Sequence, residues 1–291
     1  MLFFTDSDIK MTDEEFVLLR DLIYNYSGLY FAEENRYLLE RRLSPRLSHH
    51  QLVTFHDYYY YLKYDVSREQ ELSDIMDLLT TNETYFFRES FQLKAFTEEI
   101  IPELIAAKIK NGDKTLRIWS AGCSTGEEPY TIAILLLEMP ALAGWKIEII
   151  GTDISQRVLH HARKGVYGNS SFRVTEPHFK SRYFHEQDGG YRVNDRIREI
   201  VTFSRLNLYD SNKFLFLGKM DLIFCRNVII YFDIMSKKRV IEHFYTTLHP
   251  GGFLLLGHSE SLMNITTAFK LRHFKNDMVY EKPLLSGSVV K

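Results

Sequence analysis

The chain has 291 residues, of which 45% are hydrophobic and 25% charged, with a net charge of −2. This is the composition of a globular protein with ample material for a core, and the length favours two domains, since domains average about 150 residues. The near-neutral charge gives no global argument for nucleic acid or an anionic membrane as the main partner. Two cysteines in so long a chain are no disulfide framework and are typical of a reducing compartment.

The chain begins MLFFTDSDIK, with acids where a signal peptide needs basic residues. No run approaches the roughly 20 consecutive apolar residues of a transmembrane helix. We therefore expect a soluble cytoplasmic protein without membrane insertion.

Residues 1–80 predict an all-helical domain. Thr12 and Glu15 form a capping-box pattern, and Gly28 is suited to end the helix that follows. A basic helix is expected over 33–47, and two further helices over 55–64 and 68–79. No strand is predicted before about residue 115.

Residues 81–91 are expected to link this domain to a second one, over 92–285, where strands alternate with helices. Strands are predicted at 116–121, 146–151, 220–225, 253–257 and 278–281, with helices from about 127, over 156–164 and around 237–248. This alternation is typical of an α/β, doubly wound, mostly parallel sheet of Rossmann-like type. A small antiparallel β-subdomain is expected at about 168–204, including a strand at 200–204, and a frayed tail at 286–291.

The most informative feature is a glycine-rich turn between the first strand and its helix. Gly122 and Gly126 permit a tight turn and close approach of a ligand, and Asp153 ends the next strand, where an acid can bind a ribose diol. This pattern fits a nucleoside-containing cofactor. NAD is disfavoured because the second glycine of G-x-G-x-x-G is missing, and a P-loop because G-K-[ST] is missing.

Two readings of the turn stay open. Residues 122–126 match the G-x-S-x-G pattern of a hydrolase, with Ser124 as nucleophile and Asp221 and His258 as partners, although an all-helical upstream region does not fit that fold. Alternatively, Glu127 and Glu128 would repel a dinucleotide's phosphates but attract the cationic methionine end of S-adenosylmethionine (SAM). Both acids are also common in a first helical turn, where they complement the helix dipole.

Four blocks decide between these readings: 80–89 (TTNETYFFRE), 119–130 (WSAGCSTGEEPY), 224–232 (FCRNVIIYF) and 257–261 (GHSES). Together they resemble the CheR-type chemotaxis receptor glutamate O-methyltransferases, and the resemblance covers nearly the whole chain. It implies a Rossmann-like SAM-dependent methyltransferase domain behind a helical domain. It also implies methylation of receptor glutamates, with S-adenosylhomocysteine (SAH) as second product, and no metal.

The resemblance implies roles for individual residues. Arg88 and Tyr231 would lie near the transferred methyl group and the incoming glutamate, as the catalytic pair. Asp153 would bind the ribose, with Asn207 and Leu208 beside the adenine. The full set of implied cofactor contacts is Asn82, Thr84, Arg88, Gly122, Glu128, Asp153, Asn207, Leu208, Arg226 and Asn227.

The chemistry suits these residue types. A glutamate side chain, with a pKa of about 4.3, is already ionised near neutrality and needs no general base to attack a methyl group. Arg88 or Tyr231 would orient the carboxylate, so these residues would act through proximity and orientation rather than through acid–base catalysis. The alternatives are purely structural roles, namely a surface salt bridge for Arg88 and a core aromatic side chain for Tyr231. A SAM-binding adaptor without catalysis is a further alternative, which the intact Arg88 and Tyr231 blocks disfavour.

Partner contacts are the last expectation. The basic helix, with Arg36, Arg41, Arg42 and Arg46, would dock on acidic receptor helices, unless these arginines form internal ion pairs. Tethering of a receptor tail peptide is not expected, because the stretch 185–191 is short compared with family members that tether. Nucleic acid is disfavoured because the fourth strand lacks a [DN]-P-P-[YF] motif. We expect a monomer.

Overall fold

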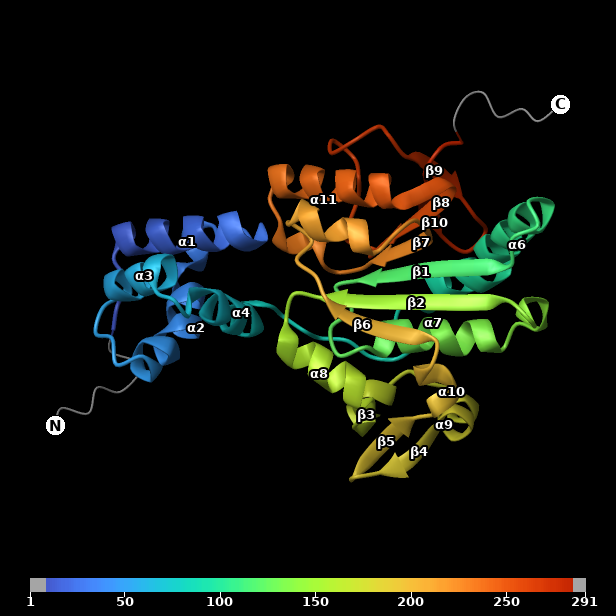
Figure 1. Ribbon diagram of the computed structural model, residues 1–291, viewed down its shortest axis with the longest axis horizontal. Helices are drawn as coiled ribbons and strands as arrows, with labels where there is room; N and C mark the ends of the chain where they lie inside the picture. The colour runs from blue at the N-terminus through green and yellow to red at the C-terminus, as the bar shows by residue number, and fades with distance from the viewer. Residues whose placement is uncertain (1–8, 285–291) are drawn as a thin grey trace.

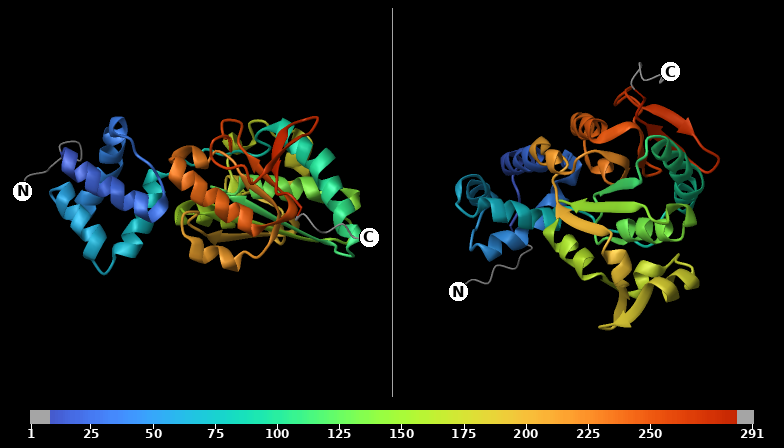
Figure 2. Two further views of the ribbon diagram at one scale, coloured as in Figure 1. Left: turned by 90° about the horizontal axis from the view of Figure 1, so that it is seen from above. Right: turned by 45° about the vertical axis from the view of Figure 1, so that its right-hand side comes forward.

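The computed structural model describes residues 9–284, so the tail predicted at 286–291 lies outside the described residues. Figure 1 shows a helical domain at one end of an elongated molecule, a larger α/β domain at the other, and a small sheet on the flank of the latter. Figure 2 shows the same two parts from other directions, joined along the long axis.

The helical domain forms where the sequence predicts it. The Thr12 side chain accepts a hydrogen bond from the Glu15 amide at the start of the first helix, and Gly28 ends that helix in the left-handed conformation, with φ 76°. The elements are α1 (Asp13–Ser27), η1 (Glu33–Asn35), α2 (Arg36–His49), α3 (Phe55–Tyr64) and α4 (Arg68–Leu79). The predicted bounds of the last two helices coincide with the observed ones.

The α/β domain is built on a seven-stranded sheet of order β6-β2-β1-β7-β8-β10-β9. The first five pair in parallel, and β10 and β9 add antiparallel strands at one edge. The strands are β1 (Thr115–Ala121), β2 (Lys146–Asp153), β6 (Val201–Arg205), β7 (Met220–Cys225), β8 (Leu248–Leu256), β9 (Lys270–His273) and β10 (Met278–Glu281). The mostly parallel Rossmann-like sheet is therefore confirmed.

Helices cover both faces of this sheet (Figure 1). Ile118 of β1 packs in the core on the α7 side, whereas its neighbour Trp119 packs in the other core, with its ring 5.2 Å from that of Phe244 in α11. This second core continues into the helical domain without a break. The helices are α5 (Ser90–Ala95), the π-helical turn η2 (Phe96–Ile100), α6 (Ile101–Lys110), α7 (Glu127–Leu137), α8 (Gln156–Lys164), α10 (Asp195–Arg198) and α11 (Ile234–Thr247), with 3-10 turns η3 (Pro140–Leu142), η5 (Ser211–Phe216) and η6 (Ile229–Tyr231).

The small antiparallel sheet exists, but its membership differs from the expectation. Its order is β3-β5-β4, formed by β3 (Val166–Tyr167), β4 (Phe184–Gln187) and β5 (Gly190–Val193), with η4 (Asn169–Phe172) and α9 (Pro177–Tyr183) between. The strand predicted at 200–204 is β6, which pairs in parallel with β2 and forms the edge of the main sheet. Assigning it to the β-subdomain was wrong, because alternation identifies a strand but not its partner.

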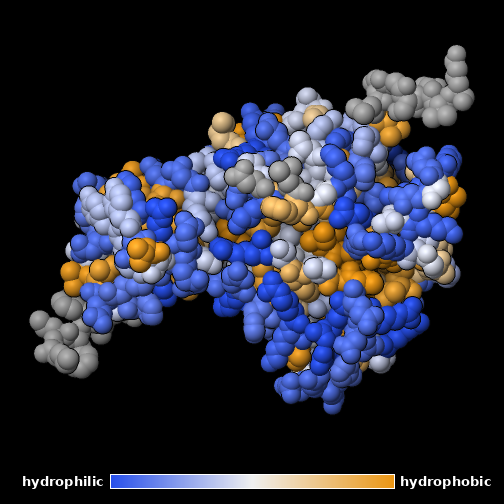
Figure 3. Space-filling view, in the orientation of Figure 1, coloured by the Kyte–Doolittle hydropathy of each residue, from blue (hydrophilic) through white to orange (hydrophobic). Residues whose placement is uncertain are grey.

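The surface is mostly hydrophilic on the face drawn in Figure 3, including the small sheet. Apolar side chains gather where residues of β2 and β6 line a shallow groove, which includes Ile147, Ile150 and Phe216. Within residues 9–284, no helix is both long enough and apolar enough to cross a bilayer.

Candidate functional site

A cavity lies at the carboxyl ends of the parallel strands, where the strand order reverses between β1 and β7. Ligands of open α/β sheets bind at such a switch point. The cavity holds about 1050 Å³ of empty space, including its open mouth, and all eleven residues singled out from the sequence line it. The other lining residues are Ser27, Leu29, Thr80, Thr81, Glu83, Tyr85, Leu93, Cys123, Ser124, Thr131, Ile154, Leu206, Val228 and Phe232.

The glycine-rich turn forms the floor. Gly122 has φ 74°, and a Cβ atom there would lie 2.4 Å from Cγ2 of Val228. The amides of Gly122 and Cys123 both donate to the Thr152 carbonyl, which ties the turn to β2. The first glycine is thus required by its conformation and by close packing against the loop after β7.

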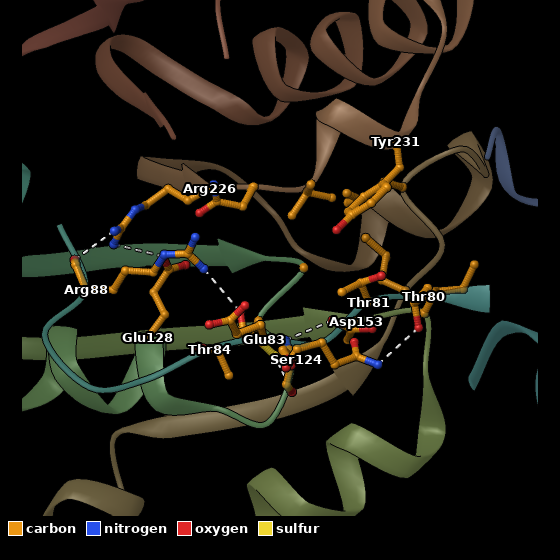
Figure 4. A pocket seen from close by; sticks show the side chains of 18 of the residues that line it. Thr80, Thr81, Glu83, Thr84, Arg88, Ser124, Glu128, Asp153, Arg226 and Tyr231 are labelled. Atoms are coloured by element: carbon orange, nitrogen blue, oxygen red, sulfur yellow. Dashed lines mark hydrogen bonds and ion pairs between the residues drawn. The ribbon is translucent and has the colours of Figure 1, made fainter. Parts of the chain in front are cut away.

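One end of the cavity carries a buried acid–guanidinium cluster (Figure 4). Glu128, in the first turn of α7, accepts a hydrogen bond from Ser120 at 2.7 Å and forms an ion pair with Arg226 at 3.2 Å. Arg226 also contacts Glu89 at 3.1 Å, and its side chain is only 4% exposed. Burial raises the pKa of Glu128, and the Arg226 guanidinium opposes that shift.

Arg88 lies at the same end with its guanidinium less engaged. It donates to the Glu83 carbonyl at 3.1 Å and lies 5.6 Å from the centre of the Tyr85 ring. Its backbone carbonyl accepts from Arg226 at 2.7 Å. Across the described part of the chain, Arg88 forms no salt bridge, so its charge is available at the cavity.

The other end is organised by Asp153, which is 6% exposed. Its two oxygens accept from the Ser124 amide at 2.9 Å and the Ser155 amide at 3.0 Å. Burial raises the pKa of this carboxyl, and the backbone N–H groups oppose the shift. Asn82 is held nearby, because its carbonyl accepts from the Ser124 hydroxyl at 3.1 Å.

Tyr231 projects into the cavity from the loop after β7 (Figure 4). It is 38% exposed, so it is not a core aromatic. Its backbone carbonyl accepts from the Tyr30 amide at 3.1 Å, and Leu29 forms an isolated β-bridge with Phe232. The helical domain thus fixes the backbone on which this tyrosine stands.

The hydrolase reading is contradicted by these positions. Asp221 lies at the start of β7, where it pairs with Lys108 at 2.8 Å and accepts from the Arg117 amide at 2.8 Å. That is the opposite edge of the sheet from Ser124, so the two cannot belong to one triad. The Ser124 hydroxyl instead donates to a backbone carbonyl.

Comparison with known proteins agrees with the geometry. Residues 14–80 match the family model described as "CheR methyltransferase, all-alpha domain", and residues 82–278 match "CheR methyltransferase, SAM binding domain". The chain belongs to the CheR methyltransferase family. It is 39% identical to chemotaxis protein methyltransferase 2 of Vibrio cholerae, over 95% of this chain and 96% of that one. It is 38% identical to the chemotaxis protein methyltransferase of Borreliella burgdorferi, over 88% and 90%.

Sequence reasoning missed three residues that contribute to the site of this CheR methyltransferase. Ser27 and Leu29 of the helical domain line the cavity, and the neighbouring Tyr26 carbonyl accepts from the Asn207 amide group at 2.6 Å. Glu260 accepts four backbone hydrogen bonds and holds the loop after β7. The block GHSES contained this acid and its partner Gly257, but its other three partners, Asn227, Val228 and Ile229, are distant in sequence.

The arginines of α2 are largely engaged inside the CheR chain. Arg36 pairs with Asp13 and Glu33, and Arg46 pairs with Glu71. Arg42 donates to the Leu79 carbonyl. Arg41 is exposed.

Within residues 9–284, no group of three or more His, Cys, Asp or Glu residues has the arrangement of a metal site.

Proposed function

We propose that this chain transfers the methyl group of SAM to glutamate side chains of chemotaxis receptors in the cytoplasm, giving methyl esters and SAH. The observation that carries the proposal is one cavity with a buried acid–guanidinium cluster at one end, a buried aspartate at the other and a half-exposed tyrosine at its mouth. Membership of the CheR family and the names of the relatives support the receptor as substrate.

The residues present fit SAM. Asn227 lines the cavity with a buried side-chain oxygen that has no hydrogen-bond partner within residues 9–284, as expected for an atom that meets a ligand. Asp153 is placed to accept from a ribose diol, and Glu128 from an ammonium group. When bound, SAM supplies an electrophilic methyl group.

The remaining cofactor contacts follow from position. Asn207 and Leu208 line the cavity beside the helical domain, suited to the adenine ring, whereas Asn82 and Thr84 line it from the linker. In this assignment Arg226 acts mainly through Glu128, because its guanidinium is already paired.

The acceptor glutamate is the anion that the free charge of Arg88 suits. Burial raises a carboxyl pKa and so favours the unreactive protonated form, which a guanidinium opposes. Tyr231 can donate a hydrogen bond to one carboxylate oxygen and leave the other to attack. Both residues orient the nucleophile, and no proton has to be removed from it.

Receptor docking is proposed on the α2 side of the mouth. Arg41 of α2 is exposed, and Arg42 follows it in the same helix, where it donates to the Leu79 carbonyl. These two arginines are suited to an acidic receptor helix, whereas Arg36 and Arg46 serve chiefly within the domain. Charge reversal at Arg41 is expected to raise the KM for receptor without changing SAH affinity.

The test uses methyl-labelled SAM, the purified chain and membranes bearing chemotaxis receptors. Label is expected on receptor bands and is expected to be released as volatile methanol by mild alkali, which identifies a carboxyl ester. Arg88→Ala is expected to lose most of the transfer, while Arg68→Ala, which removes an exposed ion pair with Glu69 away from the cavity, is the matched control. SAH binding without any transfer would favour a non-catalytic adaptor, and no SAH binding would refute the proposal.

A further inference from the structure

The loops after two neighbouring strands are joined by one carboxylate. β7 and β8 pair in parallel with Cys225 opposite Leu256, so residues 226–231 and 257–261 leave the sheet side by side. Between them, one oxygen of Glu260 accepts from the amides of Asn227 at 2.7 Å and Gly257 at 2.8 Å. Its other oxygen accepts from the amides of Val228 at 2.9 Å and Ile229 at 2.8 Å.

This carboxylate holds a backbone that is unfavourable by itself. Asn227 has φ 59°, a left-handed conformation that has a cost for a residue with a side chain, although less for asparagine than for most residues. Three successive N–H groups, from Asn227 to Ile229, converge on Glu260 and offset that cost, because hydrogen bonds to a charged acceptor are the strong ones. The loop therefore has one conformation as long as the acceptor is present.

The loop matters because of what it carries. Asn227 lines the cofactor cavity with its unpartnered oxygen, and Tyr231 enters the cavity mouth four residues later. Val228 packs over Gly122 of the glycine-rich turn. Glu260 itself does not line the cavity.

We infer that Glu260 is the positioning residue of this methyltransferase site, fixing the 226–231 loop so that Asn227 meets the cofactor and Tyr231 meets the acceptor. The inference rests on the proposed function. It assigns Glu260 no contact with either substrate.

A substitution at Gly257 tests the contact between Glu260 and the loop amides independently. A Cβ atom at this glycine would lie 2.9 Å from the Glu260 carboxylate and 3.0 Å from the Asn227 amide nitrogen. Gly257→Ala is therefore expected to displace the carboxylate while leaving it in the chain. Gly168→Ala is the matched control, because no atom lies within 4 Å of its added Cβ and its φ is also negative.

Glu260→Gln is the direct test, because glutamine has the same shape. In either orientation of the amide, its NH₂ group faces two backbone N–H groups, and two of the four hydrogen bonds are lost. We expect SAH affinity to fall about tenfold or more, by analogy with other charged hydrogen bonds, with a fall in kcat as well. Glu281→Gln, which removes a carboxylate of β10 that pairs with Arg272 of β9, is the control and is expected to change neither.

The measurements are SAH affinity by calorimetry, KM for SAM and kcat with receptor membranes, all at a temperature where circular dichroism shows each variant folded. A lower Tm with unchanged Kd, KM and kcat would make Glu260 merely structural and overturn the inference. If Glu260→Gln does not fold, Gly257→Ala gives the same comparison. If the wild type binds SAH but labels no receptor, the proposed function fails, whereas SAH affinity still decides the role of Glu260.

Discussion

Asp153 ends β2 with both carboxylate oxygens already accepting from backbone amides, which fixes its orientation before any ligand arrives. Asp153→Asn would turn an NH₂ group against one of those amides and remove the charge. We expect SAH to bind about 10- to 100-fold more weakly, the usual effect of losing a charged hydrogen bond. Calorimetry against Asp188→Asn, an exposed acid in the turn of the small sheet, measures it, and equal affinities would exclude Asp153 from the cofactor contacts.

The size of the activity loss on Ser124→Ala distinguishes a methyltransferase from a hydrolase. Ser124→Ala removes a neutral hydrogen bond to the Asn82 carbonyl. Such a bond contributes about 0.5–1.5 kcal/mol, so methyl transfer is expected to fall by only about 2- to 10-fold. Transfer assays and ester hydrolysis assays on the same preparation give the answer. A hydrolytic activity abolished by this substitution would contradict the assignment.

For individual residues, the sequence predicted those that line the cavity but not those that hold them in place. Asn82 and Glu128 stand in contiguous blocks, Asp153 follows a predicted strand, and all three line one cavity. Leu29 and Glu260 were missed as site residues, because they act across a domain boundary and between two loops. Such long-range pairings have no spacing that a single sequence reveals.

Among the elements, the helical domain is tied together by one buried acid. Glu71 of α4 is 3% exposed and accepts from Arg46 of α2 and from Tyr58 of α3. Burial alone would raise the pKa of Glu71, but the hydrogen bonds from Arg46, Tyr58 and His50 outweigh it and lower the pKa to about 2. The three helices therefore share a charged centre.

This centre predicts a pH dependence of stability. Because the folded-state pKa of Glu71 lies below that of an unfolded glutamate, about 4.3, its stabilisation is complete above that pH and is lost as the pH falls towards 2. Glu71→Gln is expected to destabilise the chain at pH 6 and to flatten its acid dependence. Urea unfolding at several pH values, with the exposed Glu69→Gln of the same helix as control, measures this. Parallel acid profiles for Glu71→Gln and wild type would contradict it.

Elements with local signals were predicted better than those defined by partners. The helices at 55–64 and 68–79 have helical periodicity in their own residues, Thr54 caps the first of them, and their bounds agree with α3 and α4. Strand β6 was recognised as a strand but assigned to the wrong sheet, because β2 is its partner and no local pattern records that.

In the whole molecule, the two domains meet at the wall of the cofactor cavity. Gly28 ends α1 with φ 76°, and a Cβ there would lie 2.6 Å from the ring of Tyr209, which follows Asn207 and Leu208. Gly28→Ala is expected to displace this wall and weaken SAH binding. Gly112→Ala is the matched control, because its φ is 69° but no atom lies within 4 Å of the added Cβ.

The comparison separates backbone strain from the contact between domains. Both alanines meet the left-handed conformation, at a cost of about 1–2 kcal/mol, and both should lower Tm. Only Gly28→Ala should change the Kd for SAH measured by calorimetry. Equal Kd values would show that the cavity tolerates a shifted helical domain.

The position of Leu29 in the cavity wall has a consequence for the kinetics of product release. The segment that closes one side of the cavity belongs to the helical domain, while the glycine-rich turn beneath belongs to the other. We expect the release of the proposed product SAH to require the two domains to part. The residence time of SAH would then depend on how firmly the domains hold together, so turnover would contain a conformational step that is separate from methyl transfer.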